Sequence, residues 1–361
     1  MGLSSSYWQL VVLRMMISAG ESVCRPMSSA IIADIFSPTA RGVANGVFSW
    51  GVYLGFGLAF VLGINVTQAD LLGYSWRSTY VLAGAPGLLV AVLILLSLRD
   101  PARQSSSQNT AAVTTNTNID LGMREYLGKL WRNFCNPSLM VLLVAAMARH
   151  TAGYSWAYNT RLYFQSYHPD FELGYWILLA SCVGGSFGVF AGGFFSDRLV
   201  SKLGLNSRLW LLSGCTLMAA PFAVLTLYLE PPASMATLIV YYLFAETWFA
   251  VLFTVIVEIV EPDVRATCIA LFLFCMNQVG GNLPVMITPL KSYLDDYRLS
   301  LALVWPGFLV LSSVLFLMSS IPLTLRQNRQ QNITESNVKD ESPDTSRSDS
   351  QGEAQRPLLD R

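Results

Sequence analysis

The sequence predicts an all-α, polytopic membrane protein that folds as a bundle of about nine transmembrane helices. Of its 361 residues, 53% are apolar and only 13% are charged, whereas a water-soluble domain usually carries about 25% charged residues. The apolar residues fall into runs of about 20, the length of a bilayer-spanning helix. The 23 basic residues balance the 23 acidic ones, so the chain lacks the positive field of a nucleic-acid-binding protein.

Three apolar runs precede a polar linker, and six follow it. The expected spans are 7–32, 40–63, 78–98, 138–164, 173–196, 207–229, 234–258, 266–290 and 300–325. They divide the chain into four parts, which are an incomplete N-terminal half (1–100), a linker with a candidate interfacial helix (101–136), a C-terminal half (137–325) and a polar tail (326–361). The linker is rich in Ser, Thr, Asn and Gln, and the tail is expected to be disordered.

The basic residues of the loops predict the orientation of the spans. When loops are assigned alternately to the two sides, only Arg77, Lys291 and Arg298 fall on one side, and the other loop cations fall opposite. By the positive-inside rule, the cation-rich side, the linker and the tail face the cytoplasm. The N-terminus is therefore expected to be lumenal or extracellular.

An eight-residue pattern occurs twice, and each copy ends one span and begins the next. Residues 34–41 and 258–265 share the order acid-Ile-x-x-Pro-x-x-Arg. Parallel repeats of six spans are typical of major facilitator transporters. The second copy follows three further spans of its half, whereas the first follows none. We therefore expect a twelve-span bundle that lacks its first three helices, through either a shortened isoform or an incomplete gene model.

Several motifs resemble the Spinster family of the major facilitator superfamily. The most specific is Arg14 followed by Gly20-Glu21 and Asp34, and residues 192–199 agree as well. The chain departs from the family pattern at Cys24-Arg25-Pro26 and at Asn282. The resemblance implies alternating-access transport of an amphiphilic lipid, either a lysophospholipid or a sphingoid phosphate, by a proton-linked or facilitative mechanism.

Ionisable residues within the spans are candidates for substrate binding or proton coupling, because an unpaired charge in a bilayer is costly. Arg14 and Glu21 are seven residues apart and share one helix face. Arg14 is predicted to bind a lipid phosphate, or to exchange partners with Glu21 as Glu21 takes up a proton. The alternative is a structural ion pair.

Three further intramembrane residues lie in the second half. Glu246 precedes the second repeat as Glu21 precedes the first, and it is either the functional counterpart of Glu21 or a member of a pair within its own helix. Arg149 and His150 lie within the span 138–164. There a histidine is suited to relay protons in a broken helix that lines a cavity, or alternatively marks a helix end at the headgroups.

Charged residues at the predicted cytoplasmic hinges are candidates for a gate. They are Asp34, Arg41, Asp197, Arg198, Glu258 and Arg265. Ion pairs between such residues are expected to hold the cytoplasmic side closed. The simpler alternative is that cytoplasmic loops collect arginines in any case.

Other functional classes have no sequence support. Six scattered cysteines and two histidines predict no disulfide framework, metal site or cofactor, and no catalytic motif indicates an enzyme. A truncated, non-transporting protein that modulates a full-length facilitator remains the alternative function. The tail ends with Glu353 and Leu358-Leu359, which resembles an acidic dileucine sorting signal, so a late endosomal or lysosomal membrane is expected, or else the plasma membrane.

Overall fold

The structure, a computed structural model, describes residues 1–35, 41–69, 76–97, 122–204 and 206–341. Within these residues every regular element is a helix and no strand occurs, which confirms the all-α expectation. The α-helices are α1 (Tyr7–Ile35), α2 (Arg41–Gln68), α3 (Trp76–Ser97), α5 (Met123–Phe134), α6 (Pro137–Tyr167), α7 (Leu173–Ala180), α8 (Ser186–Leu203), α9 (Asn206–Tyr228), α10 (Ala233–Ala245), α11 (Trp248–Ile259), α12 (Arg265–Gly280), α13 (Ile287–Leu294) and α14 (Tyr297–Glu341). Short helices of other types are η2 (Ser181–Gly185, π), η3 (Pro262–Val264, 3-10) and η4 (Leu283–Met286, 3-10).

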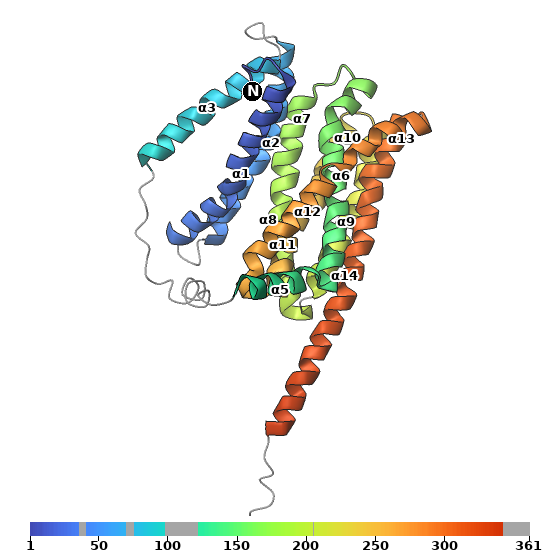
Figure 1. Cartoon of the computed structure of the whole chain (residues 1–361). Coiled ribbons are helices and arrows are strands. Elements are labelled where there is room, and N and C mark those ends of the chain that lie inside the picture. The colour runs from blue at the N-terminus through green and yellow to red at the C-terminus, as the bar shows by residue number, and fades with distance from the viewer. Residues whose placement is uncertain (36–40, 70–75, 98–121, 205, 342–361) are drawn as a thin grey trace, which may run out of the picture.

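The long helices run up and down between two ends of the molecule (Figure 1). Helix α5 lies across one end, which we call the α5 end, and α13 lies at the other, the α13 end. Helices α1 to α3 form an N-terminal group, and α6 to α14 form a C-terminal group. Contact between the groups runs chiefly through α2, which packs on α7 and η2.

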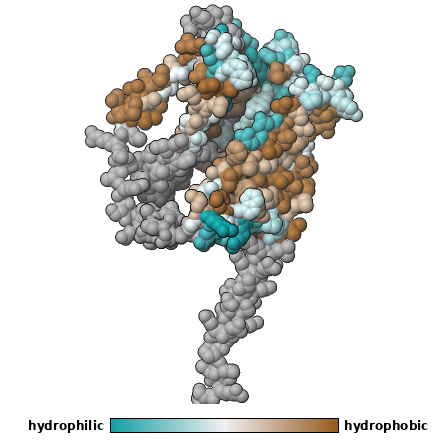
Figure 2. Space-filling view, in the orientation of Figure 1, coloured by the Kyte–Doolittle hydropathy of each residue, from teal (hydrophilic) through white to brown (hydrophobic). Residues whose placement is uncertain are grey.

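Six stretches are long and apolar enough to cross a membrane, judged by length and composition. They are Trp50–Gln68, Trp76–Ser97, Leu173–Val200, Asn206–Tyr228, Arg265–Leu294 and Tyr297–Thr324. The face drawn in Figure 2 shows apolar side chains along the middle of the bundle and polar side chains toward both the α5 end and the α13 end. The chain is thus a helical membrane protein.

Four predicted spans differ from the single helices expected. The span 266–290 comprises α12, η4 and the start of α13, because α12 ends at Gly280. The span 234–258 is two helices, because α10 ends at Ala245 and α11 begins at Trp248. The span 173–196 contains the π-helical segment η2. The last helix continues past the predicted boundary at residue 325 and ends at Glu341.

Two clusters of buried side chains form the interior of the C-terminal group. One, toward the α5 end, includes Leu139, Val255 and Phe272. The other, toward the α13 end, includes Trp156 and Trp305. Since lipid tails are as apolar as these side chains, close packing holds such a bundle together more than removal from water does. Both clusters involve α6, and the candidate site lies on this helix between them.

Candidate functional site

A cavity of about 360 Å³ lies where α2 meets α6, η2, α10 and α11. Aromatic side chains form most of its wall. They are Tyr53, Phe56, Tyr154, Trp156, Tyr241, Tyr242, Trp248 and Phe249. The same cavity is lined by Arg149, His150 and Glu246, so the structure brings together three of the predicted transport residues. A mainly aromatic wall with a few charged groups is typical of a site for an amphiphilic ligand.

Arg149 is the buried cation of this cavity, with 2% of its surface exposed. One terminal nitrogen, Nη2, donates to the carbonyl oxygen of Ala245 at 2.5 Å. That carbonyl lies at the end of α10, where backbone acceptors lack partners in their own helix. The guanidinium carbon lies 5.0 Å from the ring centre of Trp248, which is a cation–π contact. The Nε atom has no hydrogen-bond partner among the described residues, so Arg149 retains donor capacity.

Glu246 occupies the break between α10 and α11, and it is half-buried. Its Oε2 accepts a hydrogen bond of 3.2 Å from the hydroxyl of Tyr53 on α2. This bond joins the two groups of helices, and its partner lies outside the helix of Glu246. Among the described ion pairs, none joins Glu246 to Arg149. The opposite charges therefore face one cavity without direct pairing.

His150 lies in the middle of α6, which runs unbroken from Pro137 to Tyr167. Both the broken helix and the helix end expected from the sequence are therefore wrong. The Nε2 atom of His150 lies 3.0 Å from Oδ1 of Asn277 on α12. Because Nδ2 of Asn277 donates to the Leu273 carbonyl, Oδ1 is the acceptor and His150 donates from Nε2.

The bond between His150 and Asn277 fastens α12 to α6, so its removal is expected to loosen this contact. Asn277→Ala should lower the free energy of unfolding by about 1 kcal/mol, the usual contribution of one hydrogen bond. The melting temperature in detergent, followed by intrinsic fluorescence, measures the loss. Gln278→Ala is the control, because Gln278 is exposed on the same helix. Equal melting temperatures for the two variants would contradict the assignment.

Arg14 and Glu21 lie on α1 and are exposed. No ion pair joins these two described side chains. Their charges act on the hydroxyl of Tyr154, which lines the cavity. Arg14 also lines a shallow hollow with Trp76 and Tyr80 of α3. The pair thus lies within electrostatic reach of the cavity rather than inside it.

The predicted gating residues are only partly described. Asp34 lies in the last turn of α1, Arg41 begins α2 and Asp197 lies in α8, but their side chains lie outside the described part of the structure. The guanidinium of Arg198 lies over the ring of Phe194 at 4.2 Å.

The second repeat forms a different ion pair from the one expected. Glu258 pairs with Arg208 of α9 at 3.3 Å, whereas Arg265 donates to the carbonyl of Val260. Arg208 is buried and also donates to Ser196 of α8. The ion pair of Glu258 among the described side chains is thus made within the C-terminal group. Sequence reasoning counted Arg208 only as a loop cation.

Close approach of helices shapes the wall of the cavity. A Cβ atom on Gly188 would lie 2.6 Å from the Leu243 carbonyl oxygen of α10. On the side facing α2, a Cβ atom on Gly57 would lie 2.7 Å from Cα of Leu178. Real side chains do not approach so closely, so glycine is required where backbones touch. The position of Tyr53 beside η2 depends on this packing.

Comparison with known proteins identifies the family to which this chain belongs. Residues 1–284 match the Major Facilitator Superfamily. The chain belongs to this superfamily. The likeness to the Spinster family within it is also confirmed, because several relatives of this facilitator chain are Spinster proteins.

Three relatives illustrate the range of similarity. The chain is 26% identical over 309 residues to an MFS-type efflux pump of Mycolicibacterium smegmatis, covering 82% of the chain and 66% of the pump. It is 25% identical over 348 residues to protein spinster homolog 3 of Danio rerio, covering 88% and 67%. Over 111 residues it is 33% identical to the sphingosine-1-phosphate transporter SPNS2 of Danio rerio, covering 31% and 21%. The facilitator chain thus spans about two thirds of the length of the two relatives that it matches most extensively.

Solved structures share the same fold. A crystal structure of a bacterial homolog of the human lysosomal transporter Spinster, inward-facing and unoccupied, matches with a TM-score of 0.59 at 20% identity. The match covers 90% of this facilitator chain and 78% of that chain. An inward-facing, occupied structure of a bacterial homolog matches with a TM-score of 0.58.

Proposed function

We propose that this protein is a Spinster-type facilitator that moves a lysophospholipid or sphingoid phosphate by alternating access. The observation that carries the proposal is Arg149, a buried guanidinium with an unpartnered Nε in a cavity of aromatic side chains. A guanidinium suits a phosphate group, because its planar nitrogens can donate two parallel hydrogen bonds. The aromatic wall suits the first part of an acyl or sphingoid chain.

Glu246 is proposed to couple proton uptake to the contact between the two groups of helices. As a carboxylate it accepts the hydrogen bond from Tyr53. Protonation would remove its charge and weaken this bond, because hydrogen bonds to charged groups are the stronger ones. Separation of α2 from the break between α10 and α11 would then open the cavity. Arg14, Glu21 and His150 are proposed to guide substrate or protons at its mouth.

The α5 end is proposed to face the cytoplasm, with residues 1–100 and 137–325 as the two moving halves. The gate proposal for Asp34, Arg41, Asp197, Arg198 and Arg265 rests on their positions in helices that end or begin at this side. The contact between Glu258 and Arg208 stiffens the C-terminal half as it moves. A lysosomal or plasma membrane is the proposed location.

Flux measurements in proteoliposomes test the proposed function. We expect vesicles with the purified protein to take up labelled lysophospholipid faster than protein-free vesicles, and an inward proton gradient to change the rate. Arg161→Gln, which removes a charge from the same helix outside the cavity, should leave the rate unchanged. Flux at the protein-free level from folded protein, for lysophospholipids and sphingoid phosphates alike, would contradict the proposal.

A further inference from the structure

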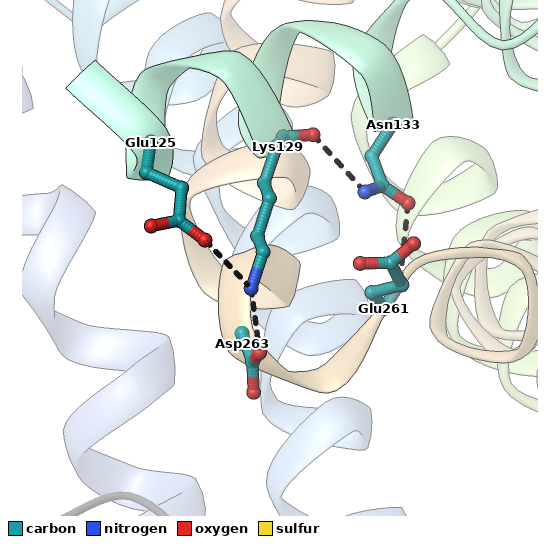
Figure 3. Close-up of polar contacts among 5 residues, drawn as sticks. All are labelled: Glu125, Lys129, Asn133, Glu261 and Asp263. Atoms are coloured by element: carbon teal, nitrogen blue, oxygen red, sulfur yellow. Dashed lines mark hydrogen bonds and ion pairs between the residues drawn. The ribbon is translucent and has the colours of Figure 1, made fainter. Parts of the chain in front are cut away.

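Helix α5 is held across the end of the bundle by polar contacts with the turn between α11 and α12 (Figure 3). Nζ of Lys129 lies 3.9 Å from carboxylate oxygens of both Glu125 and Asp263. Oδ1 of Asn133 accepts a hydrogen bond from the backbone N–H of Glu261 at 3.4 Å, and the hydroxyls of Tyr126 and Thr267 lie 2.6 Å apart. The helix is therefore fixed across the α5 end of the bundle.

A second side of α5 is apolar and has no partner among the described residues. Met123, Leu127 and Trp131 are 74%, 52% and 70% exposed. They are spaced by four residues, so their side chains form one stripe along the helix. The stripe lies beside the face that packs on the bundle, where Leu130 and Asn133 are buried.

The other edge of the apolar stripe is basic. Arg124 follows Met123, Arg132 follows Trp131, and both are exposed. Neither arginine forms an ion pair with a described side chain, whereas Lys129, one turn before Arg132, is occupied by Glu125 and Asp263. The two arginines are thus available for negative charges outside the protein.

We propose that α5 lies in the surface of an anionic lipid bilayer and binds its phosphate headgroups. The stripe of Met123, Leu127 and Trp131 enters the boundary between headgroups and acyl chains, and Arg124 and Arg132 contact lipid phosphates. Three observations support a bilayer as the occupant. The helix lies across the membrane-spanning helices at one end (Figure 1), an exposed tryptophan suits the interface, and amphipathic helices with a basic edge bind anionic membranes.

Lipid bound to α5 would also be connected to the transport cavity through the turn between α11 and α12. The turn that α5 contacts joins α11 to α12, and these helices carry Trp248 beside Arg149 and Asn277 beside His150. A bilayer-anchored α5 therefore holds this turn at the level of the headgroups. The proposal does not depend on which lipid is transported.

Spin labels placed one residue apart test the position of α5. Leu127→Cys and Gly128→Cys are made in the full chain with its own cysteines replaced, and both are reconstituted in vesicles of neutral phosphatidylcholine with and without phosphatidylglycerol. Both sites are exposed, and a Cβ atom on Gly128 meets nothing within 4 Å. One residue turns the helix by about 100°. We expect the label at 127 to collide more with oxygen, which dissolves in lipid, and the label at 128 more with a water-soluble nickel complex.

Charge variants test the role of the two arginines. Phosphatidylglycerol should increase the depth of the label at 127 in the bilayer. The double variant Arg124→Gln with Arg132→Gln should abolish this shift. Lys202→Gln at the end of α8 should retain it. A label at 127 that collides mainly with the nickel complex would overturn the proposal. A label shielded from both reagents would also overturn it, because another part of the protein would then cover the stripe. An unchanged shift in the double variant would overturn the headgroup contact.

Discussion

Arg149→Gln is expected to weaken binding of a phosphate-bearing lysolipid by about 10- to 100-fold. Hydrogen bonds to a charged group contribute about 1.5 to 3 kcal/mol, and each 1.4 kcal/mol is about a tenfold change in affinity. A neutral monoacylglycerol with the same acyl chain makes no such bond, so its affinity should change little. Titration of the purified protein with lysophosphatidic acid and with the monoacylglycerol measures the two effects separately.

Two further variants at this helix guard against loss of folding as the explanation. Arg149→Lys keeps the charge that lies over Trp248 but removes the planar pair of donors, so its affinity for the phosphate-bearing lipid should be intermediate. Arg161→Gln removes a charge from α6 outside the cavity and should bind as the unchanged protein does. An equal loss of affinity for both ligands in Arg149→Gln would argue for a structural role instead.

Gly57→Ala is expected to destabilise the contact between the two groups of helices. The added methyl group would lie 2.7 Å from Cα of Leu178 and 2.8 Å from Oγ of Ser181. Since a backbone atom cannot rotate away, α2 must shift from α7 and η2. Overpacking of this kind costs about 1 to 3 kcal/mol. We expect a lower melting temperature, together with faster hydrogen exchange in α2 and η2.

Gly55→Ala on the same helix is the matched control, and its effect on stability should have the opposite sign. A Cβ atom there meets nothing within 4 Å. Alanine is the better helix former by about 0.5 to 1 kcal/mol, so stability should stay the same or rise. If both variants melted alike, the close approach of α2 to η2 would not determine the contact between the groups.

The spans could be predicted from the sequence because the backbone N–H and C=O groups of a long apolar run in a bilayer must bond to each other. A helix provides these hydrogen bonds. The break between α10 and α11 could not be predicted. The sequence around Glu246 contains neither Gly nor Pro, so nothing local marks the end of α10. The extension of α14 to Glu341 was also missed, because its polar residues carry no apolar period.

The candidate site could be predicted only in part. A charge within an apolar run is visible in any sequence, so Arg149, His150 and Glu246 were found. Their partners were not, because Tyr53 is 193 positions from Glu246 and Asn277 is 127 positions from His150. Aromatic and amide side chains are common in membrane spans, so the sequence does not indicate which of them bond to a charged residue of another helix. Arg208 was overlooked for the same reason, since its pairing with Glu258 depends on how α9 packs.

The packed centre of the C-terminal group contains its own optical reporter. The indole rings of Trp156 and Trp305 stack with their centres 4.0 Å apart and their planes inclined by 14°. Two chromophores so close share their excitations, so the pair should add a split band to the circular dichroism of the protein. Neither ring belongs to α1, α2 or α3. The band would therefore survive a separation of the two groups of helices and vanish when α6 and α14 come apart, which distinguishes disengagement from unfolding in one measurement.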